Sequence, residues 1–260
     1  MKLSLCESGT EKDIEKYHLK GWIAQHKIDG CRCLAVCLNG QVNLLGRSGS
    51  DYTRKFNEVV EELKSFNGIF DGEIVCDTFE HTQSRVHTEN SLKLKLLEKE
   101  YPAIFYVFDV LSYENRDLRC EMLSKRLKIL AEMPLKSLKS VKMLDYTPDL
   151  INCWERAKEL KWEGIIIKRL NSKYAGKRTY DWLKIKLTKS KDILVKSYEV
   201  NPAGIRVEDE NGIAVQITGS QNISVKKELD ERGECLIEVN YLNETDNGKL
   251  RQPTFKCKKE

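Results

Sequence analysis

The feature that most constrains the fold is a succession of short apolar runs, each about the length of one strand and bounded by turn residues. The clearest turn is Asn39-Gly40, which separates the apolar runs 34–38 and 42–45. Asn-Gly readily adopts the positive φ angles that a two-residue hairpin requires, so these runs predict an antiparallel pair. Similar apolar runs predict further strands at 22–25, 69–75, 103–111, 165–168 and 182–185.

Helices are expected between these strands. Apolar side chains recur at the spacing of one helix face in the segments 53–66, 92–98, 118–131 and 148–160. The polar segment 77–90 has no such periodicity and is expected to be a loop. Strands and helices mixed in this way predict an α+β fold.

The sequence changes character at about residue 188. Helical periodicity fades, and strand-like runs alternate with turn signals at Asn211-Gly212 and at 246–248. This spacing is typical of a small β-barrel. The expected organisation is a first domain over 1–187 and a β-barrel domain over 188–260, with the Lys-rich stretch 186–191 as the hinge.

Length and charge narrow the functional classes only in part. The 260 residues suffice for two modest domains with hydrophobic cores. The net charge of +4 arises from 44 Lys and Arg against 40 Asp and Glu, which by itself does not require a nucleic-acid partner. Lysines gather, however, at 182–196 and 256–259, and a local basic surface can attract phosphates. The alternative interpretation is a solvated lysine face.

Neither a membrane protein nor a secreted protein is indicated. The chain contains no run of 18 apolar residues, and its first residues lack the apolar core of a signal peptide. The nine cysteines follow no disulfide framework and no zinc-binding spacing, which fits free thiols in a reducing compartment. We therefore expect a cytoplasmic protein with no membrane partner.

The most distinctive local motif is Lys27-Ile28-Asp29-Gly30, in which a lysine ends one expected strand and Asp-Gly turns the chain into the next. A lysine at a strand end is held in a fixed place and is a candidate nucleophile. Its amine attacks an electrophile only after losing its proton, which burial and neighbouring cations such as Arg32 favour. Taken alone, the four-residue pattern is more often an ordinary surface turn.

Further motifs follow in order. Glu73 ends one expected strand with a carboxylate, Phe108 lies within a buried strand, and Glu163 begins another strand. Lys184 and Lys186 share one face of a strand because side chains alternate along it. Taken one at a time, Glu163 is consistent with an ordinary turn and Phe108 with a core aromatic side chain. Lys184 and Lys186 are consistent with the exposed face of an edge strand.

Together and in this order, the motifs resemble the covalent nucleotidyltransferase superfamily, which comprises ATP-dependent DNA ligases, RNA ligases and mRNA capping enzymes. The resemblance covers nearly the whole chain. The segments 106–111 and 250–255 are similar to those of the ATP-dependent DNA ligases in particular. This resemblance implies an adenylation (nucleotidyltransferase) domain of antiparallel sheets with helices, followed by a C-terminal OB-fold β-barrel.

The resemblance also implies roles in nucleotide and metal binding. Lys27 would be the nucleophile that forms a lysyl–AMP phosphoramidate, and Gln25 would lie where ligases read the adenine amino group. Glu73 would hold the ribose hydroxyl, and Phe108 would stack on adenine. Glu73 and Glu163 would bind the catalytic divalent metal, because carboxylate oxygens suit Mg²⁺.

A second set of residues would contact phosphates. The resemblance places Arg32 at the arginine that contacts the nucleotide and later the nick phosphate. It places Arg47 in a ligase-like turn, as a second phosphate or ribose contact. Arg178, from the Gly-Lys-Arg segment, would join Lys184 and Lys186 in the same role. Cations in these positions are physically reasonable, because transfer at phosphorus depends on positioning and charge neutralisation.

The implied reaction uses ATP as the AMP donor with Mg²⁺ or Mn²⁺. Lys27 would take AMP from ATP, AMP would move to the 5′-phosphate of a nick, and the 3′-hydroxyl would then expel AMP. The implied partner is nicked double-stranded DNA, bound by a monomer.

Two departures from the ligase pattern and two alternative functions remain. Gln25 stands where Glu is usual, and the residues 256–260 stand where the family has an Arg-X-Asp-Lys motif that orients pyrophosphate. Either the tail lysines substitute for that motif or the motif is eroded, which affects the first step most. An RNA ligase or a capping-type nucleotidyltransferase is one alternative, and a non-catalytic nucleic-acid-binding relative is the other.

Overall fold

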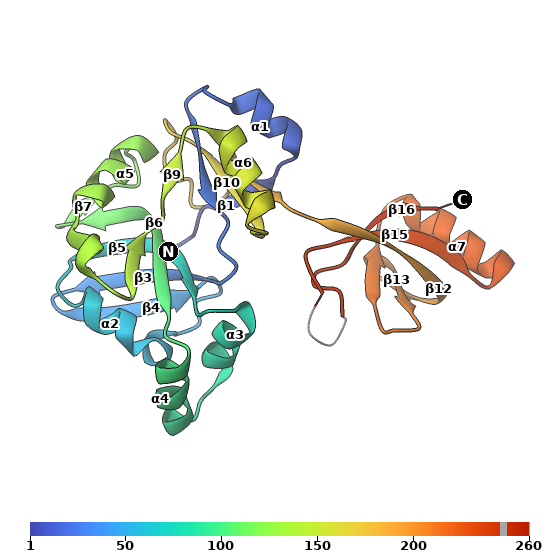
Figure 1. Ribbon diagram of the computed structural model, residues 1–260, viewed down its shortest axis with the longest axis horizontal. Helices are drawn as coiled ribbons and strands as arrows, with labels where there is room; N and C mark the ends of the chain where they lie inside the picture. Colours follow the sequence, from blue (N-terminus) through green and yellow to red (C-terminus); the bar gives the residue numbers. More distant parts are fainter. Residues whose placement is uncertain (245–248, 260) are drawn as a thin grey trace. The chain divides into compact units, whose positions relative to one another are not determined.

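The computed structural model describes residues 1–244 and 249–259. The chain divides into two compact units, Met1–Ile185 and Lys186–Glu260 (Figure 1). The turn expected at 246–248 lies outside the described residues. Within the described ranges, no helix has both the length and the apolar character needed to cross a lipid bilayer.

The first unit contains a six-stranded, mainly antiparallel sheet in the order β4-β3-β5-β6-β7, with β8 parallel to β6. The predicted hairpin is confirmed at its centre, where Asn39 and Gly40 both have positive φ angles, 50° and 77°. The strands are β3 (Cys31–Leu38), β4 (Gln41–Gly46), β5 (Gly68–Val75), β6 (Ile104–Tyr113), β7 (Arg116–Asp117) and β8 (Val141–Met143).

A five-stranded sheet in the order β1-β11-β10-β2-β9 forms the rest of the first unit. Strand β1 runs parallel to β11, whereas β10 runs antiparallel to β2. The strands are β1 (Leu5–Ser8), β2 (Trp22–His26), β9 (Tyr146–Thr147), β10 (Gly164–Arg169) and β11 (Arg178–Lys186).

Six α-helices complete the first unit, and two of them, α2 and α5, pack on the core of the six-stranded sheet. A separate apolar cluster joins the two sheets, with Leu34, Phe108 and Leu111 from one sheet and Trp182 from the other. The helices are α1 (Glu11–Tyr17), α2 (Asn57–Leu63), α3 (Phe79–His87), α4 (Ser91–Glu100), α5 (Leu123–Glu132) and α6 (Leu150–Glu159).

Helix α3 contradicts the expectation of a loop at 77–90. Its inward face is polar, because Thr82 and Arg85 are its buried residues. The Arg85 guanidinium donates to the Glu58 carboxylate at 2.9 Å and to the Lys55 carbonyl oxygen at 2.7 Å. A helix whose buried side consists of hydrogen-bonded polar groups leaves no apolar periodicity in the sequence.

The helix expected at 118–131 begins only at Leu123. Upstream, the Leu118 amide donates to the Leu111 carbonyl oxygen at 2.9 Å, which ties this residue to β6. Apolar spacing alone could not reveal that contact between two separate segments of the chain.

The second unit is a five-stranded antiparallel sheet in the order β14-β13-β12-β15-β16, with one helix. Its core contains the fully buried residues Val195, Val207, Ile237 and Val239. The elements are β12 (Lys189–Asn201), β13 (Gly204–Asp209), β14 (Ala214–Ile217), α7 (Gln221–Arg232), β15 (Cys235–Tyr241) and β16 (Thr254–Lys258).

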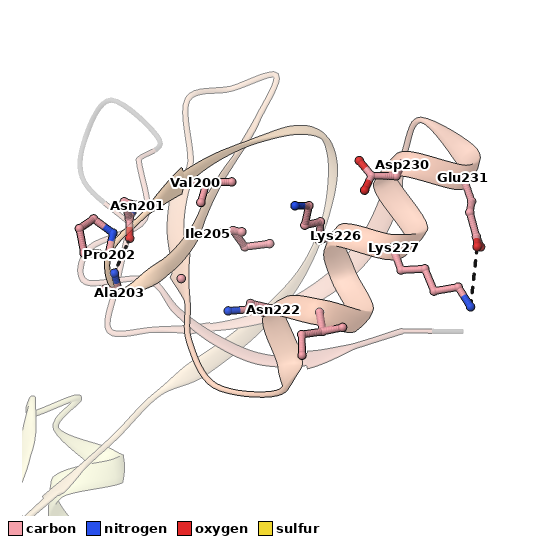
Figure 2. A pocket seen from close by; sticks show the side chains of 12 residues that line it. Val200, Asn201, Pro202, Ala203, Ile205, Asn222, Lys226, Lys227, Asp230 and Glu231 are labelled. Carbon is pink, nitrogen blue, oxygen red and sulfur yellow. Dashed lines mark hydrogen bonds and ion pairs between the residues drawn. The ribbon is translucent and has the colours of Figure 1, made fainter.

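Helix α7 is an addition to the strands expected after residue 188, where helical periodicity fades. Only Val225 and Leu229 are buried along it, so its apolar face is one residue wide and shows little periodicity. A groove of about 790 Å³ lies between this helix and the turn that joins β12 to β13, and Figure 2 shows the side chains that line it. Val200 and Ile223 are exposed at the groove, and none of its lining residues is a predicted site residue.

Candidate functional site

Lys27 and Glu163 lie side by side, one after the end of β2 and the other before the start of its partner strand β10. Lys27 directly follows β2, Glu163 directly precedes β10, and the Lys27 amide donates to the Gly164 carbonyl oxygen at 3.0 Å. The Lys27 ammonium in turn donates to the Glu163 carboxylate. The two side chains are 21% and 6% exposed, so the structure joins the predicted nucleophile to a predicted metal ligand in a largely enclosed pair.

A stacked pair of rings lies immediately before these two residues in the chain. The rings of His26 and Trp162 are 4.0 Å apart between centroids and 20° from parallel. Burial lowers the pKa of His26 to about 4, and the positive charge of Lys27 contributes to the shift. The imidazole is therefore neutral near pH 7. Neither ring belongs to a predicted site residue, although an aromatic ring directly precedes each motif residue in the chain.

Gln25 is buried with one polar atom unpaired. It is 1% exposed, and its Nε2 donates to the Leu144 carbonyl oxygen at 3.3 Å. Among the described residues, nothing forms a hydrogen bond with its Oε1. A buried acceptor without a donor costs roughly 1–3 kcal/mol, which a ligand N–H group would recover. The amide is thus oriented to accept a hydrogen bond from a bound molecule.

Arg32 is held by the carboxylate of Asp71, which is fully buried. The Arg32 Nε and Nη2 atoms donate to Asp71 Oδ1 and Oδ2, each at 2.6 Å, and Nη2 also donates to the Ser4 carbonyl oxygen at 3.2 Å. Burial alone would lower the pKa of Arg32, but the Asp71 carboxylate more than offsets this and raises it. The guanidinium is therefore permanently charged, and these bonds leave Nη1 as the nitrogen available to a ligand.

Glu73 lies beside this guanidinium. The register of the sheet aligns Arg32 on β3, Glu73 on β5 and Tyr106 on β6, so the three residues form one row across the sheet. Burial raises the pKa of Glu73 to about 7, against the opposing effects of Arg32 and Lys27 and with a smaller contribution from Glu163. Glu73 is therefore electrostatically coupled to the Lys27–Glu163 pair as well as to Arg32.

Phe108 is 8% exposed and has two cations near its ring. The Arg32 guanidinium carbon is 4.7 Å from its ring centroid, and the Lys168 ammonium is 4.1 Å from it. The ring also packs edge-on against Trp182, with centroids 6.1 Å apart. Tyr106, two residues earlier on β6, is half-buried on the same side of the strand.

Lys168 is a buried cation to which the sequence analysis assigned no role. It is 2% exposed and 4.2 Å from the ring centroid of Trp182. Burial lowers its pKa to about 8, although Asp109 acts in the opposite direction. Its position at the end of β10, on the same side of the strand as Ile166, follows from alternation along the strand.

Of the remaining predicted phosphate contacts, Arg47 and Arg178 are exposed, whereas Lys184 and Lys186 are half-buried. Arg178 donates to the Cys6 carbonyl oxygen at 2.6 Å, and Arg47 is exposed in the turn after β4. The Lys184 carbonyl oxygen accepts a hydrogen bond from the Gly9 amide at 3.0 Å. Lys186 belongs to the second unit, where its ammonium donates to Gln252 Oε1 at 2.7 Å. Among the other predicted site residues, Lys27 and Glu163 form an ion pair and Arg32 contacts Phe108, and Glu73 is electrostatically linked to Lys27, Glu163 and Arg32.

The acidic residues fit a metal ion that is shared with a ligand. In the part of the chain that the structure describes, no three His, Cys, Asp or Glu residues form a metal-binding cluster. Mg²⁺ commonly takes only one or two protein carboxylates and completes its coordination with water and substrate phosphates. Glu163, whose carboxylate helps to raise the pKa of Glu73, and Glu73 itself match that incomplete set.

Known proteins of similar sequence indicate the family to which this chain belongs. Residues 1–186 match the family model of the ATP dependent DNA ligase domain. The chain is 24% identical over 261 residues to the SPbeta prophage-derived DNA ligase-like protein LigB of Bacillus subtilis, covering 93% of this chain and 94% of LigB. It is also 24% identical to the multifunctional non-homologous end joining protein LigD of Mycolicibacterium smegmatis, covering 95% of this chain but only 37% of LigD.

A solved structure from an analysis of DNA binding by Lig E DNA ligases resembles the whole chain. Its TM-score is 0.72 at 17% identity, and the match covers 100% of this chain and 99% of that one. At this identity the likeness concerns the fold, and it confirms the mixed α+β, nucleotidyltransferase-type architecture expected from the sequence.

Proposed function

Because the chain belongs to the family of ATP-dependent DNA ligase domains, we propose that it seals nicks in double-stranded DNA through a lysyl–AMP intermediate. The observation that carries this proposal is the Lys27–Glu163 pair at the ends of β2 and β10, beside Arg32 and Glu73. This set would supply a nucleophile, phosphate-binding charge and metal-binding carboxylates close together. The enzyme would act as a monomer in the compartment that holds the DNA.

In the first step, the Lys27 amine would attack the α-phosphorus of ATP. The Lys27 ammonium first releases one proton to solvent, and the nitrogen releases a second as the phosphorus–nitrogen bond forms. The bond from the α-phosphorus to the bridging oxygen breaks, and pyrophosphate leaves with that electron pair. Glu163 and Glu73 would hold Mg²⁺ or Mn²⁺, which neutralises developing phosphate charge when bound. Glu163 meanwhile fixes the Lys27 side chain, so the nucleophile is oriented before ATP arrives.

Recognition of adenine would rest on Gln25. Its unpaired Oε1 is suited to accept a hydrogen bond from the adenine 6-amino group, whereas guanine presents a carbonyl oxygen there. This polarity favours ATP over GTP and therefore a ligase over a capping-type enzyme. Phe108 would stack on the base by replacing one of the two cations at its ring, and Glu73 would accept from the ribose hydroxyl.

The later steps would use the cations. Arg32, Arg47, Arg178, Lys184 and Lys186 would bind the nucleotide and nick phosphates. AMP passes from the Lys27 nitrogen to the 5′-phosphate of the nick, which leaves the lysine free. The 3′-hydroxyl oxygen then attacks that phosphate, a phosphodiester bond forms and AMP leaves.

We assign residues 1–187 to the adenylation domain and 188–260 to an OB-fold domain. The assignment of the second is supported by its five strands, by the position of α7 between the third and fourth strand, and by the approach of β14 to β16. An OB-fold is a partly open five-stranded barrel that often binds nucleic acid. This domain would grip the DNA.

The lysines of the C-terminal tail are already engaged in ion pairs, which should slow lysyl–AMP formation. Lys256 pairs with Glu238 at 2.8 Å, Lys258 pairs with Glu228, and Lys259 pairs with Glu238 at 3.1 Å. To orient pyrophosphate, they would have to exchange these partners for a ligand. We therefore expect lysyl–AMP formation to be slow compared with the transfer of AMP to DNA.

The test is covalent labelling with α-labelled ATP and Mg²⁺. The wild-type chain should take up label, Lys27→Ala should lose it, and Lys64→Ala, at an exposed lysine on the same unit, should retain it. Labelled protein should then seal a nicked DNA duplex. Labelling by GTP alone would favour a capping-type enzyme, and joining of nicked RNA alone would favour an RNA ligase. DNA binding without any labelling would identify a non-catalytic relative.

A further inference from the structure

We propose that Tyr174 is a positioning residue that aims the Arg32 guanidinium at the phosphates of the bound nucleotide. The inference rests on the proposed function, which supplies the nucleotide. Tyr174 lies in the segment between β10 and β11, far from Arg32 in the sequence. The two residues act on one carboxylate, that of Asp71.

The shared carboxylate connects the phenol to the guanidinium. The Tyr174 hydroxyl donates to Asp71 Oδ2 at 2.6 Å, and Arg32 Nη2 donates to the same oxygen at 2.6 Å. Arg32 Nε donates to the other oxygen, Oδ1, also at 2.6 Å. Asp71 is fully buried, so no bulk water is present to replace the phenol as a donor.

The phenol is itself held in one orientation. The Tyr174 ring packs edge-on against Trp182, with centroids 5.8 Å apart, and the Arg126 guanidinium carbon is 5.9 Å from the ring centroid. The Tyr174 amide donates to the Arg119 carbonyl oxygen at 3.0 Å. Burial and the Asp71 carboxylate raise the pKa of Tyr174, so the hydroxyl remains a donor across the working pH range.

The same segment anchors Arg32 a second time. Arg32 Nη2 donates to the Ser4 carbonyl oxygen at 3.2 Å, and Ser4 Oγ accepts from the Gly176 amide at 2.9 Å. The Leu5 amide also donates to the Lys177 carbonyl oxygen at 3.0 Å. Residues 174–177 therefore fix Arg32 through both Asp71 and Ser4, and both anchors hold the Nε–Nη2 edge.

Holding one edge of a planar guanidinium determines where its other nitrogen points. If Nη1 is the phosphate donor, Tyr174 affects phosphate binding but not adenosine binding. Removing the Tyr174 hydroxyl leaves Arg32 charged and still paired with Asp71. The expected defect is therefore a wrong orientation of the Arg32 guanidinium, not loss of its charge. We expect about a 10-fold loss of affinity for a triphosphate, the size typical of one hydrogen bond to a charged group.

The experiment measures binding of α,β-methylene-ATP, which cannot transfer AMP, and of adenosine to the full chain by calorimetry. Tyr174→Phe should bind the triphosphate about 10-fold more weakly and adenosine within 2-fold of wild type. Tyr180→Phe is the matched control, since Tyr180 is 77% exposed on β11. In an Arg32→Ala background, Tyr174→Phe should add no further loss.

Equal losses for both ligands, or an undiminished effect of Tyr174→Phe without Arg32, would show a merely structural role and overturn the inference. If Tyr174→Phe does not fold, Ser4→Ala loosens the same anchor and should weaken triphosphate binding selectively. Labelling with ATP runs in parallel. A wild-type chain that binds the analogue but takes up no label overturns the proposed function alone, and a chain that binds neither ligand overturns both proposals.

Discussion

The ammonium of Lys27 and the carboxylate of Glu163 form an ion pair that bridges the end of β2 and the start of β10. Glu163→Gln removes the charge that holds this lysine and contributes to metal binding. We expect lysyl–AMP formation to slow roughly 100-fold, comparable to removal of one preorganised electrostatic contact. The measurement is the single-turnover labelling rate at saturating ATP and Mg²⁺.

The matched control for this variant is Glu159→Gln, which neutralises an exposed glutamate at the end of α6. It should label at the wild-type rate. A Glu163→Gln protein that keeps the wild-type rate would show that the ion pair has no part in the reaction.

Gln25 offers a test of base selection. Gln25→Leu is close in size but removes the unpaired Oε1 acceptor, so the preference for ATP over GTP should fall at least 10-fold. The check is competition between the two nucleotides in the labelling assay. Stability should stay within about 1 kcal/mol of wild type, because losing the bond from Nε2 to the Leu144 carbonyl oxygen is offset by removing the unpaired Oε1 acceptor. An unchanged nucleotide preference would place adenine recognition elsewhere.

Glu73 predicts a pH-dependent stability. Its pKa is about 7 in the folded chain, against an ordinary value of 4.5, and the main cause is burial. Below pH 4.5 both states are protonated and Glu73 contributes nothing. As the pH rises to 7, the unfolded chain releases the proton first, so the folded state loses stability, and above pH 7 the whole penalty is present.

Glu73→Gln cannot ionise and should escape this penalty. Without nucleotide, we expect the variant to be roughly 1–3 kcal/mol more stable than wild type at pH 8 and indistinguishable near pH 4.5. Urea unfolding at both pH values measures the difference. Glu61→Gln, at an exposed position on α2, controls for the substitution. A gain of equal size at both pH values would contradict the assigned pKa.

The sequence predicts the longer strands of the first unit, but it misses helices whose buried face shows little apolar periodicity. The Asn39-Gly40 hairpin could be anticipated because turn geometry is a local property of two residues. Helix α3 could not, because its buried face consists of hydrogen-bonded Thr82 and Arg85. Helix α7 could not either, because a contact one residue wide gives almost no apolar periodicity.

The candidate site divides in the same way. Residues with a role in a motif, such as Lys27 and Glu163, could be named in advance, and the structure brings these two together. Asp71 and Tyr174 could not be linked, since 103 residues separate them and neither has a local pattern that indicates the other. Contacts of this kind arise only when the two sheets pack.

Asp109 directly follows Phe108, the predicted stacking aromatic residue, and we expect Asp109 to stabilise the fold rather than to take part in the reaction. It forms a bidentate pair with Arg126, at 2.7 and 2.8 Å, in which both side chains are fully buried. Asp109→Asn would leave the Arg126 charge buried without a counter-charge, so we expect a loss of about 3–5 kcal/mol in the free energy of unfolding. The exposed pair of Asp117 and Arg119 is the control, and Asp117→Asn should cost no more than about 1 kcal/mol. Urea unfolding compares the variants at one pH.

Equal losses for the two variants would mean that burial adds nothing to the Asp109 pair. A stable Asp109→Asn chain that no longer takes up label would instead place Asp109 in the reaction itself.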